Sequence, residues 1–562
     1  MKPKLPGELV WTVRGLLAAA CAYVAVAVAA VVLVSPRVPF ADAWRHYARL
    51  LDTPFPSSVL AADNGHPEIF ANLVRYASLH WLAGDERLQI AAGLVLALAT
   101  WGMMLRIVLR ANDLPALTRA MAALALTLGV FWLGNARALL HDNESLHVYS
   151  VLLCVVGAIA LVVDRNGRSF ASRSRVAMAS GLCFVAAFNF GSGIAGFAAL
   201  FVLLFVQRGA MRDYLVVAAG LVLALLCYRG LAGGAFAAWS FRPWEQAGVA
   251  LRWLAAPLIF LFWPLVDPAA AAALPHPFDG VGAIARAWTA VCGDVHRSVV
   301  PQELAGAALI FMIVIATLRR RRADDAGNPI ANLGLALAWF GVGVAGMVGL
   351  TRTSYFAENP LQLYAPRYLS WSTLAWAGLL TVFLAKPIRR QLQLVVIVAI
   401  GVLALAAEGG MLVIMQHERD TANADAVSAV VGIWPDGRSP GENTRDDVSA
   451  GAAALRRAGT GPFAWPEAAM LGQALPVGAY RLDAAKLEAE PAELAAQPLS
   501  FRLQVEIVEG RCGRERLLVA SEGRVVGLLI RDDGNQWHGA AIGAQPDALD
   551  VFEVPCARDQ AL

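Results

Sequence analysis

The chain has 562 residues, of which 58% are hydrophobic and 16% are charged, and its formal net charge is +3. This composition is too apolar for a soluble protein of such length, so it excludes the soluble classes and indicates a membrane protein. The expected partner is a lipid bilayer, and no nucleic acid partner is expected.

The first apolar segment covers residues 13–34, and Lys2, Lys4 and Arg14 lie at or before its start. About 20 apolar residues cross a bilayer, whereas the apolar part of a cleaved signal peptide has about 7–15, so we interpret the segment as a retained span. Basic residues mark the cytoplasmic side of a span. The N-terminus is therefore predicted in the cytoplasm, and the loop after the span is predicted outside.

Further apolar segments alternate with polar loops, and every second loop is basic. The apolar segments are residues 88–109, 120–138, 146–163, 176–190, 194–207, 214–231, 304–318, 333–350, 368–384 and 392–415. The basic loops are residues 106–119, 165–175, 208–212, 319–322 and 386–390. Two short segments, 253–266 and 281–292, either form a hairpin of spans or include a re-entrant piece. The pattern predicts an all-α bundle of 11 or 13 spans, with the N-terminus inside and the C-terminal tail outside.

Hydrophobicity falls from about residue 417 onward. We therefore expect a multi-span domain at residues 1–416 and a periplasmic C-terminal domain at residues 417–562. The first part of this tail is rich in Ala, Asp and Glu and is expected to be helical. Three stretches alternate apolar and polar residues as strands do: 501–508, 516–519 and 525–530. The C-terminal domain is thus predicted to be α/β with a small β-sheet.

Cys512 and Cys556 are the only cysteines of the tail, and no cysteine pair in the chain has metal-binding spacing. In an oxidising compartment these two thiols can form a disulfide, and the alternative is a pair of buried free thiols. The predicted location of the tail outside the cytoplasm favours the disulfide.

Three of the loops predicted outside the membrane concentrate residues with catalytic potential. They contain Asp42, Trp44, His46, Asp52, Asp63, His66 and Glu68 in the first loop, His141, Asp142, Glu144 and His147 in the second, and Arg352, Tyr355, Glu358, Arg367 and Tyr368 in the third. Residues 66–84 mix apolar and polar positions in a way typical of an amphipathic helix in the outer interface. We therefore place the candidate site at the outer face.

These residue types suit the transfer of a sugar from a lipid-linked phosphate. The attacking hydroxyl needs a base, for which Asp42 is the candidate. The leaving phosphate needs cations, and Arg352 with Arg367 fits because a guanidinium binds phosphate oxygens in pairs. Asp142 and Glu144 are candidates to position the acceptor or to bind a divalent cation, Mg²⁺ or Mn²⁺. His66 is a further catalytic candidate, and the other candidate substrate-binding residues are Trp44, Glu68 and Tyr368.

Each of these residues also has a simpler interpretation. Carboxylates in an outer loop are usually just solvated. Arg367 and Tyr368 at the start of a span can act as interfacial anchors. His66 can cap or pack against the helix that begins near Pro67. The concentration of such residues in the outer loops outweighs these alternatives.

The order of these features resembles the GT-C class of membrane glycosyltransferases, which includes protein mannosyltransferases and aminoarabinose transferases. The shared layout is a first span, an Asp soon after it, interfacial helices, and a short acidic loop between the third and fourth spans. On this resemblance, which covers most of residues 10–415, Asp42 corresponds to the catalytic Asp, and Asp142 and Glu144 to the acidic loop. Ala43 follows Asp42, so the usual adjacent acidic pair is missing, and the resemblance supports the fold more than the substrate.

The sequence and this resemblance together predict an inverting inner-membrane glycosyltransferase that uses a polyprenyl-phosphate sugar at the periplasmic face. The acceptor is expected to be an envelope glycan, lipid or protein. One alternative is a polysaccharide polymerase or O-antigen ligase, in which arginines and a histidine of the outer loops dominate. Another is a flippase or transporter, which is expected to carry charges within its spans, whereas here they concentrate near the span ends.

Overall fold

The computed structural model describes residues 7–163, 172–231, 241–266, 279–292, 299–322, 327–386, 388–433, 445–492, 499–507, 514–532 and 534–554. The chain divides into two compact units. Unit 1 comprises Met1–Leu33, Ala61–Phe70 and Ile90–Ile414, and unit 2 comprises Val34–Leu60, Ala71–Gln89 and Met415–Leu562. The predicted boundary at residues 416/417 lies close to Met415, but unit 2 also takes in two segments from the N-terminal part of the chain.

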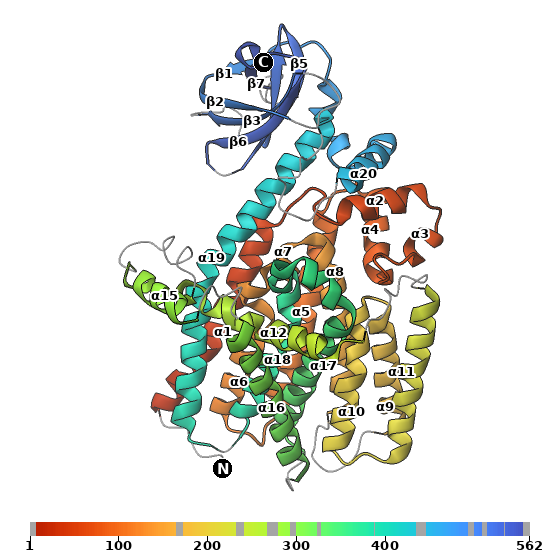
Figure 1. Cartoon of the computed structure of the whole chain (residues 1–562), viewed down its shortest axis with the longest axis vertical. Coiled ribbons are helices and arrows are strands. Elements are labelled where there is room, and N and C mark those ends of the chain that lie inside the picture. Colours follow the sequence, from red (N-terminus) through yellow and green to blue (C-terminus); the bar gives the residue numbers. More distant parts are fainter. Residues whose placement is uncertain are drawn as a thin grey trace. The chain divides into compact units, whose positions relative to one another are not determined.

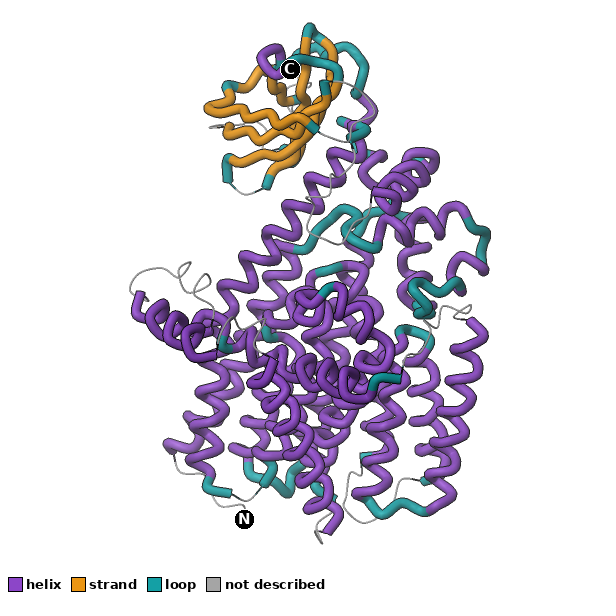
Figure 2. The backbone as a smooth tube through the Cα atoms, in the orientation of Figure 1, coloured by secondary structure: helices purple, strands orange, loops and turns teal. Residues whose placement is uncertain are grey.

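Unit 1 is a bundle of helices (Figures 1 and 2). Its helices are α1 (Gly7–Val34), α5 (Arg87–Arg110), α6 (Ala116–Phe131), α7 (Ala136–Leu140), α8 (Asp142–Val162), α9 (Arg173–Ala187), α10 (Gly196–Val206), α11 (Met211–Leu231), α12 (Pro243–Leu261), α13 (Trp263–Val266), α15 (Asp279–Cys292), α16 (Val299–Arg322), α17 (Pro329–Glu358), α18 (Leu369–Leu384) and the first part of α19 (Arg390–Val431). Short 3₁₀ turns join some of them: η1 (Leu133–Asn135), η2 (Gly191–Ala195), η3 (Pro360–Tyr364) and η4 (Pro366–Tyr368).

Eight helices in the described part of the chain are long and apolar enough to cross a membrane, and α6 with α7 counts as one of them. The predicted helical bundle is confirmed, with eight candidate spans in the described chain, and the count of 11 or 13 spans stays a prediction. The eight differ in burial. Within their most apolar windows, α6–α7 is 89% buried and α8 is 67% buried, whereas α11 is only 17% buried. Most of α6–α7 and α8 is therefore enclosed by other parts of the protein, whereas most of α11 faces outward.

Small residues allow the central helices α17 and α18 to cross closely. A Cβ atom at Gly334 would lie 2.6 Å from the carbonyl oxygen of Gly378, and one at Gly378 would lie 2.5 Å from the carbonyl oxygen of Gly334. Only glycine at both positions permits this approach, which is the usual way in which membrane helices gain close packing. The crossing fixes α17, the helix that carries Arg352.

Unit 2 contains the helices α2 (Ala43–Asp52), α3 (Ser57–Leu60), most of α4 (Ile69–Trp81), and α20 (Arg445–Ala458). The amphipathic helix expected within residues 66–84 is α4. Its polar residues Asn72, Arg75 and Ser78 are buried, whereas Leu73 and Trp81 are exposed. Ala71 and Leu79 are buried beside these polar residues, so α4 buries a mixed face and exposes part of its apolar surface.

The C-terminal part of unit 2 is an antiparallel half-barrel sheet, shown in orange in Figure 2. Its strands are β1 (Tyr480–Leu482), β2 (Ala484–Pro491), β3 (Ser500–Ile507), β4 (Arg516–Ser521), β5 (Arg524–Arg531), β6 (Gln536–Ile542) and β7 (Asp550–Glu553), in the order β1-β7-β4-β5-β6-β3-β2. Alternate residues such as Leu503, Val505 and Leu529 fill one buried core. The predicted strands are confirmed as β3, β4 and β5.

Four sequence-based expectations need correction. The Ala- and Glu-rich tail is helical in α20 but forms a strand at β2, because that segment pairs along β3. The apolar run that was expected to end at Leu350 continues as helix to Glu358. Asp142 and Glu144 lie in the first turn of α8 rather than in a loop. The tail expected from residue 417 begins inside the continuous helix α19.

The predicted Cys512–Cys556 disulfide and the loop at residues 268–274 lie outside the described residues. The disulfide therefore stays a prediction.

Candidate functional site

A tight turn in unit 1 presents His66. Asp63 and His66 exchange two backbone hydrogen bonds, with N···O distances of 2.9 and 2.7 Å. Between them Asn64 has φ 47° and Gly65 has φ 77°. An Asn-Gly pair favours such a two-residue turn because both residues accept positive φ. The Asn-Gly-His sequence thus fixes the position of the imidazole, and His66 does not cap α4, which begins three residues later.

Both ring nitrogens of His66 have polar neighbours. Nδ1 lies 2.7 Å from the Tyr228 hydroxyl, and Nε2 lies 3.4 Å from Nη2 of Arg352. A guanidinium can only donate, so this arrangement assigns Nε2 as the acceptor and Nδ1–H as the donor to Tyr228. The side chain of His66 is half-buried. The ring is therefore held in one neutral tautomer beside a fixed positive charge.

The surroundings of His66 disfavour its protonation. Burial, and then the positive charge of Arg352, lower the pKa of His66 from 6.5 to about 4, and Asp63 only partly opposes this. The loss of water around a cation and repulsion by a like charge both favour the neutral imidazole. At neutral pH His66 is therefore uncharged.

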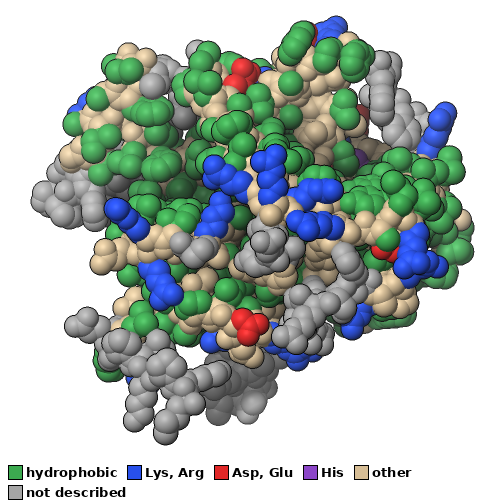
Figure 3. Space-filling view, turned by 90° about the horizontal axis from the view of Figure 1, so that it is seen from below, with side chains coloured by type: hydrophobic (Ala, Val, Ile, Leu, Met, Phe, Trp, Pro, Cys, Tyr) green, Lys and Arg blue, Asp and Glu red, His purple; other side chains and the backbone are tan. Residues whose placement is uncertain are grey.

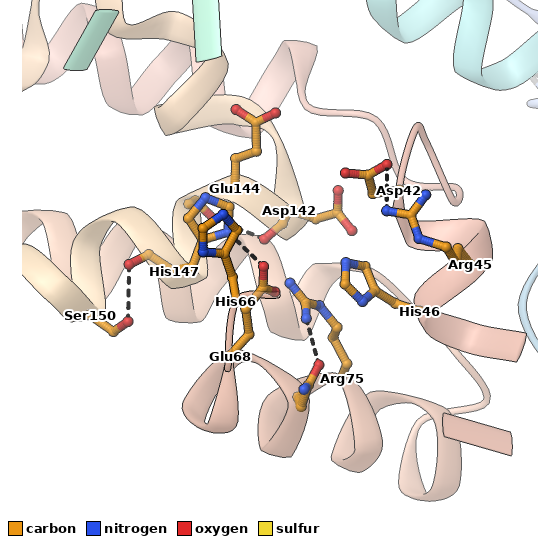
Figure 4. A network of polar contacts seen from close by, with 12 residues as sticks. Asp42, Arg45, His46, His66, Glu68, Arg75, Asp142, Glu144, His147 and Ser150 are labelled. Carbon is orange, nitrogen blue, oxygen red and sulfur yellow. Dashed lines mark hydrogen bonds and ion pairs between the residues drawn. The ribbon is translucent and has the colours of Figure 1, made fainter. Parts of the chain in front are cut away.

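A second histidine joins this group through an aromatic contact. The ring centroid of Phe190 lies 4.6 Å from that of His66 and 4.3 Å from that of His147, and the His147 and Phe190 planes differ by only 12°. Nδ1 of His147 lies 3.9 Å from Oε1 of Glu68. Figure 4 shows His66, Glu68 and His147 grouped together. These side chains form one polar cluster at the N-terminal end of α8.

The first turn of α8 brings two further carboxylates to the same helix end. Oδ1 of Asp142 lies 3.3 Å from Nδ1 of His141, and Oε1 of Glu144 lies 3.1 Å from Nε of Arg137. Asp142 is 0% exposed and Glu144 is 7% exposed. The interpretation of these two as solvated loop carboxylates is therefore wrong. Their position at a helix N-terminus also stabilises negative charge through the helix dipole.

These carboxylates were also the candidate metal ligands. Among the described residues, no group of three or more His, Cys, Asp or Glu side chains is arranged to hold a metal ion. The proposed Mg²⁺ or Mn²⁺ requirement stays a prediction, and Asp142 and Glu144 stay its candidate ligands.

The two arginines of the third loop meet around one tyrosine. The guanidinium of Arg352 lies 5.9 Å from the ring centroid of Tyr355, and Nη2 of Arg367 lies 3.4 Å from the Tyr355 hydroxyl. Arg367 also donates to Gln362 at 2.8 Å and stacks on Tyr368 with its guanidinium 5.1 Å from the ring centroid. Within the described chain, Arg352 forms no ion pair with a carboxylate. Arg352 and Arg367 therefore both contact Tyr355, and Arg352 remains able to bind an external anion.

The first-loop candidates Asp42 and Trp44 belong to unit 2. Asp42 precedes α2, and its Oδ1 lies 3.0 Å from Nη2 of Arg45. Arg45 also pairs with Asp447 at 3.3 Å. The Asp42 carboxylate remains 42% exposed and so is open to solvent. Trp44, in contrast, is 0% exposed, and its role in substrate binding stays a prediction.

Several residues that build the cluster could not be singled out from the sequence. Phe190 and Gly191 lie where the apolar segments 176–190 and 194–207 meet, and Tyr228 lies within the apolar segment 214–231. A Cβ atom at Gly191 would lie 2.8 Å from both Nδ1 of His66 and the Tyr228 hydroxyl oxygen. The glycine-rich turn was the one available signal, because such turns mark close approaches.

Unit 1 thus defines a class: a helical membrane protein with a buried polar and charged site at one end of its bundle. No model of a known protein family matches the chain, and no curated protein sequence matches it significantly. Its activity is therefore inferred from the site.

Gly191→Ala is expected to lower thermal stability, whereas Gly346→Ala is not. The new methyl group at residue 191 would force His66 and Tyr228 apart, and overpacking of this kind costs about 1–3 kcal/mol. Gly346 is helical and has no neighbour within 4 Å of a new Cβ atom. Alanine there should be neutral or stabilising by up to about 1 kcal/mol. Unfolding midpoints in detergent test this, and equal midpoints for Gly191→Ala and the parent would contradict the His66 geometry.

Acidification from about pH 7.5 to about pH 5 is expected to destabilise the parent protein more than a His66→Asn variant. Because the folded pKa of His66 is about 4 and its ordinary value is 6.5, the unfolded chain binds a proton between these values that the folded protein does not. This contribution to stability is complete above pH 6.5 and is lost as the pH falls toward 4. For a half-buried ring we expect a difference of about 1 kcal/mol, measured as unfolding midpoints. If the unfolding midpoints of both proteins fell equally with pH, the lowered pKa of His66 would be excluded.

Proposed function

We propose that the protein is an inner-membrane glycosyltransferase that moves a sugar from a polyprenyl-phosphate donor to an envelope glycan, lipid or protein. The observation that carries this proposal is Arg352, a half-buried guanidinium without a described carboxylate partner. It lies beside the neutral His66, and like Arg367 it contacts Tyr355. Because no described carboxylate pairs with it, the Arg352 guanidinium suits an anionic ligand. Its planar fork suits phosphate in particular.

In this proposal the reaction is a direct displacement at the anomeric carbon. The acceptor oxygen forms a bond to that carbon, its proton passes to a carboxylate base, for which Asp42 is the sequence-based candidate, and the bond from the carbon to the phosphate oxygen breaks. The electron pair leaves with the polyprenyl phosphate, whose charge Arg352 and Arg367 stabilise. One displacement inverts the configuration at the carbon. Asp142 and Glu144 order the acceptor side of the site through their pairs with His141 and Arg137.

The His66 contact also gives the donor site a means of sensing its ligand. While the site is empty, Arg352 faces Nε2 of His66 and opposes its protonation. A phosphate bound to Arg352 offsets that charge and so raises the affinity of His66 for a proton. His66 can then donate a hydrogen bond to a phosphate oxygen. This is the role we assign to it in donor binding.

The proposed orientation places the site in the periplasm and Arg319–Arg322 in the cytoplasm. Figure 3 shows the lower face of the helical bundle, where Lys and Arg side chains gather and acidic ones are few. Arg322 ends α16, and α17 starts near that end and carries Arg352 in its last turns. The site therefore lies at the opposite end of the bundle from the basic face, as the positive-inside rule requires.

The orientation predicts opposite labelling of two exposed positions, Asn64 and Arg322. In a background without exposed cysteine, Asn64→Cys should react with an impermeant maleimide when applied outside spheroplasts. Arg322→Cys should react only after the membrane is opened. The reverse pattern would place the site in the cytoplasm and remove the proposed donor geometry.

A polysaccharide polymerase or O-antigen ligase is the second candidate. The direct contact between His66 and Arg352 favours it, because that class relies on arginines and a histidine. Such an enzyme takes a diphosphate-linked oligosaccharide rather than a monophosphate-linked sugar. A flippase or transporter is the third candidate, but the charged cluster lies at the ends of α8 and α17.

The deciding experiment compares the two kinds of donor. Proteoliposomes with the parent chain receive polyprenyl monophosphates carrying a panel of labelled sugars, or the matched diphosphates, with an envelope extract as acceptor. Transfer from a monophosphate that needs Arg352 is the expected result. Transfer only from diphosphates would favour the second candidate, and movement of the lipid across the bilayer without transfer would favour the third.

A further inference from the structure

A second candidate site in unit 1 reaches the basic end of the bundle and shares no lining residue with the cluster around His66. It is a cavity of about 640 Å³ formed by α6, α12, α16, α18 and the start of α19. Most of its lining is apolar, with side chains such as Leu258, Phe311, Ile315, Trp376, Leu380 and Ile400. Among the described residues that line it, Arg319 and Lys386 are basic and none is acidic.

The cavity has the length of a lipid chain. Its lining residues on and just after α18 run from Thr373 to Lys386, two residues past the end of that helix. At 1.5 Å per residue this is a distance of about 20 Å. The hydrocarbon of one leaflet is about 15 Å thick. An acyl chain is the occupant that fits both the shape and the lining.

Two neighbouring cations stand at the mouth of this cavity. Burial, and then the charge of Arg319, lower the pKa of Lys386. In the described part of the chain neither side chain forms an ion pair with a carboxylate. Figure 3 shows the basic face to which this end belongs. Like charges that repel one another are stabilised by an anion that both can contact.

We propose that this cavity binds an anionic phospholipid of the adjacent leaflet, with the phosphate between Arg319 and Lys386 and one acyl chain along α18. Basic pockets between membrane helices are suited to anionic headgroups, because charge attraction and burial of the chain act together. The lipid would fill the space between α16, α18 and α19 and so support the bundle from the end opposite the site. This proposal does not depend on the proposed enzymatic activity.

The test measures lipid retention by native mass spectrometry of the purified full chain with added phosphatidylglycerol or phosphatidylethanolamine. The parent should retain phosphatidylglycerol at least about tenfold better than phosphatidylethanolamine. An Arg319→Gln and Lys386→Gln double variant should lose this preference. The matched control, Arg322→Gln with Arg389→Gln, changes two exposed basic residues that do not line the cavity and should keep it.

A third variant tests the acyl chain separately from the charge. Ile400→Trp adds bulk to the cavity wall and leaves both cations, so it should lower retention of phosphatidylglycerol and phosphatidylethanolamine alike. Circular dichroism and size-exclusion profiles verify that each variant is folded. Equal retention of the two lipids by the parent, full retention by the double variant, or full retention by Ile400→Trp would each overturn the proposal. Preference for a polyprenyl phosphate over phosphatidylglycerol would overturn it as well.

Discussion

Asp42→Asn is expected to lower the turnover of sugar transfer by about 10²–10⁴-fold. The amide keeps the size of the carboxylate and can still accept a hydrogen bond from Arg45, which pairs with Asp42 at 3.0 Å. It cannot take the proton of the acceptor hydroxyl. Release of labelled sugar from the donor, followed over time at saturating acceptor, measures the effect.

Asp447→Asn is the matched control for this prediction. Asp447 pairs with the same arginine, at 3.3 Å, so its amide variant also removes one negative charge beside Arg45. It has no part in the proposed proton transfer and should keep turnover within a few-fold of the parent. If Asp42→Asn and Asp447→Asn slow transfer equally, or if Asp42→Asn transfers at the parental rate, Asp42 is not the base.

Arg352→Gln is expected to lower kcat/KM for the donor by roughly 10- to 150-fold. Hydrogen bonds to a charged group contribute about 1.5–3 kcal/mol, and the glutamine offers one weak donor where the guanidinium offers a charged fork. Arg352→Lys should give an intermediate loss, because a point charge attracts phosphate but cannot bind two oxygens in a plane. Donor titrations with the folded variants measure these effects.

Arg242→Gln is the control for general loss of positive charge. Arg242 is exposed and pairs with Glu245 at 3.3 Å near the start of α12. Its replacement should leave donor kinetics unchanged. A parental KM and kcat for both Arg352 variants would show that the donor phosphate binds elsewhere.

Long apolar runs made the helical bundle predictable from the sequence. The ends of the helices were less predictable, because polar residues do not by themselves end a helix. Residues 351–358 of α17 contain Thr, Arg, Ser and Glu, yet the helix continues until Asn359 and Pro360, where proline prevents further extension. Arg352 therefore lies on a rigid element and not on a loop. The strand β2 shows the opposite error, since Ala, Lys and Glu favour helix until pairing with β3 decides otherwise.

The candidate site was predictable as a set of residue types and not as a set of contacts. The Asn-Gly pair before His66 was a local signal for its turn. The partner of its ring, Tyr228, lies 162 positions along the chain, so only the packing of the bundle brings them together. Burial of Asp142 and Glu144 likewise depends on distant helices that the sequence pattern does not identify.

The central claim is that the leaving group is a lipid monophosphate. Release of free polyprenyl phosphate tests this claim most directly. Purified protein in nanodiscs is incubated with a polyprenyl [³²P]phosphate sugar and an acceptor extract, and the labelled lipids are separated by chromatography. We predict acceptor-dependent formation of free polyprenyl [³²P]phosphate in equal amount to the transferred sugar, and its loss with Arg352→Gln. The account would be contradicted if no monophosphate donor of the panel released free polyprenyl phosphate while a diphosphate donor was active in a parallel reaction.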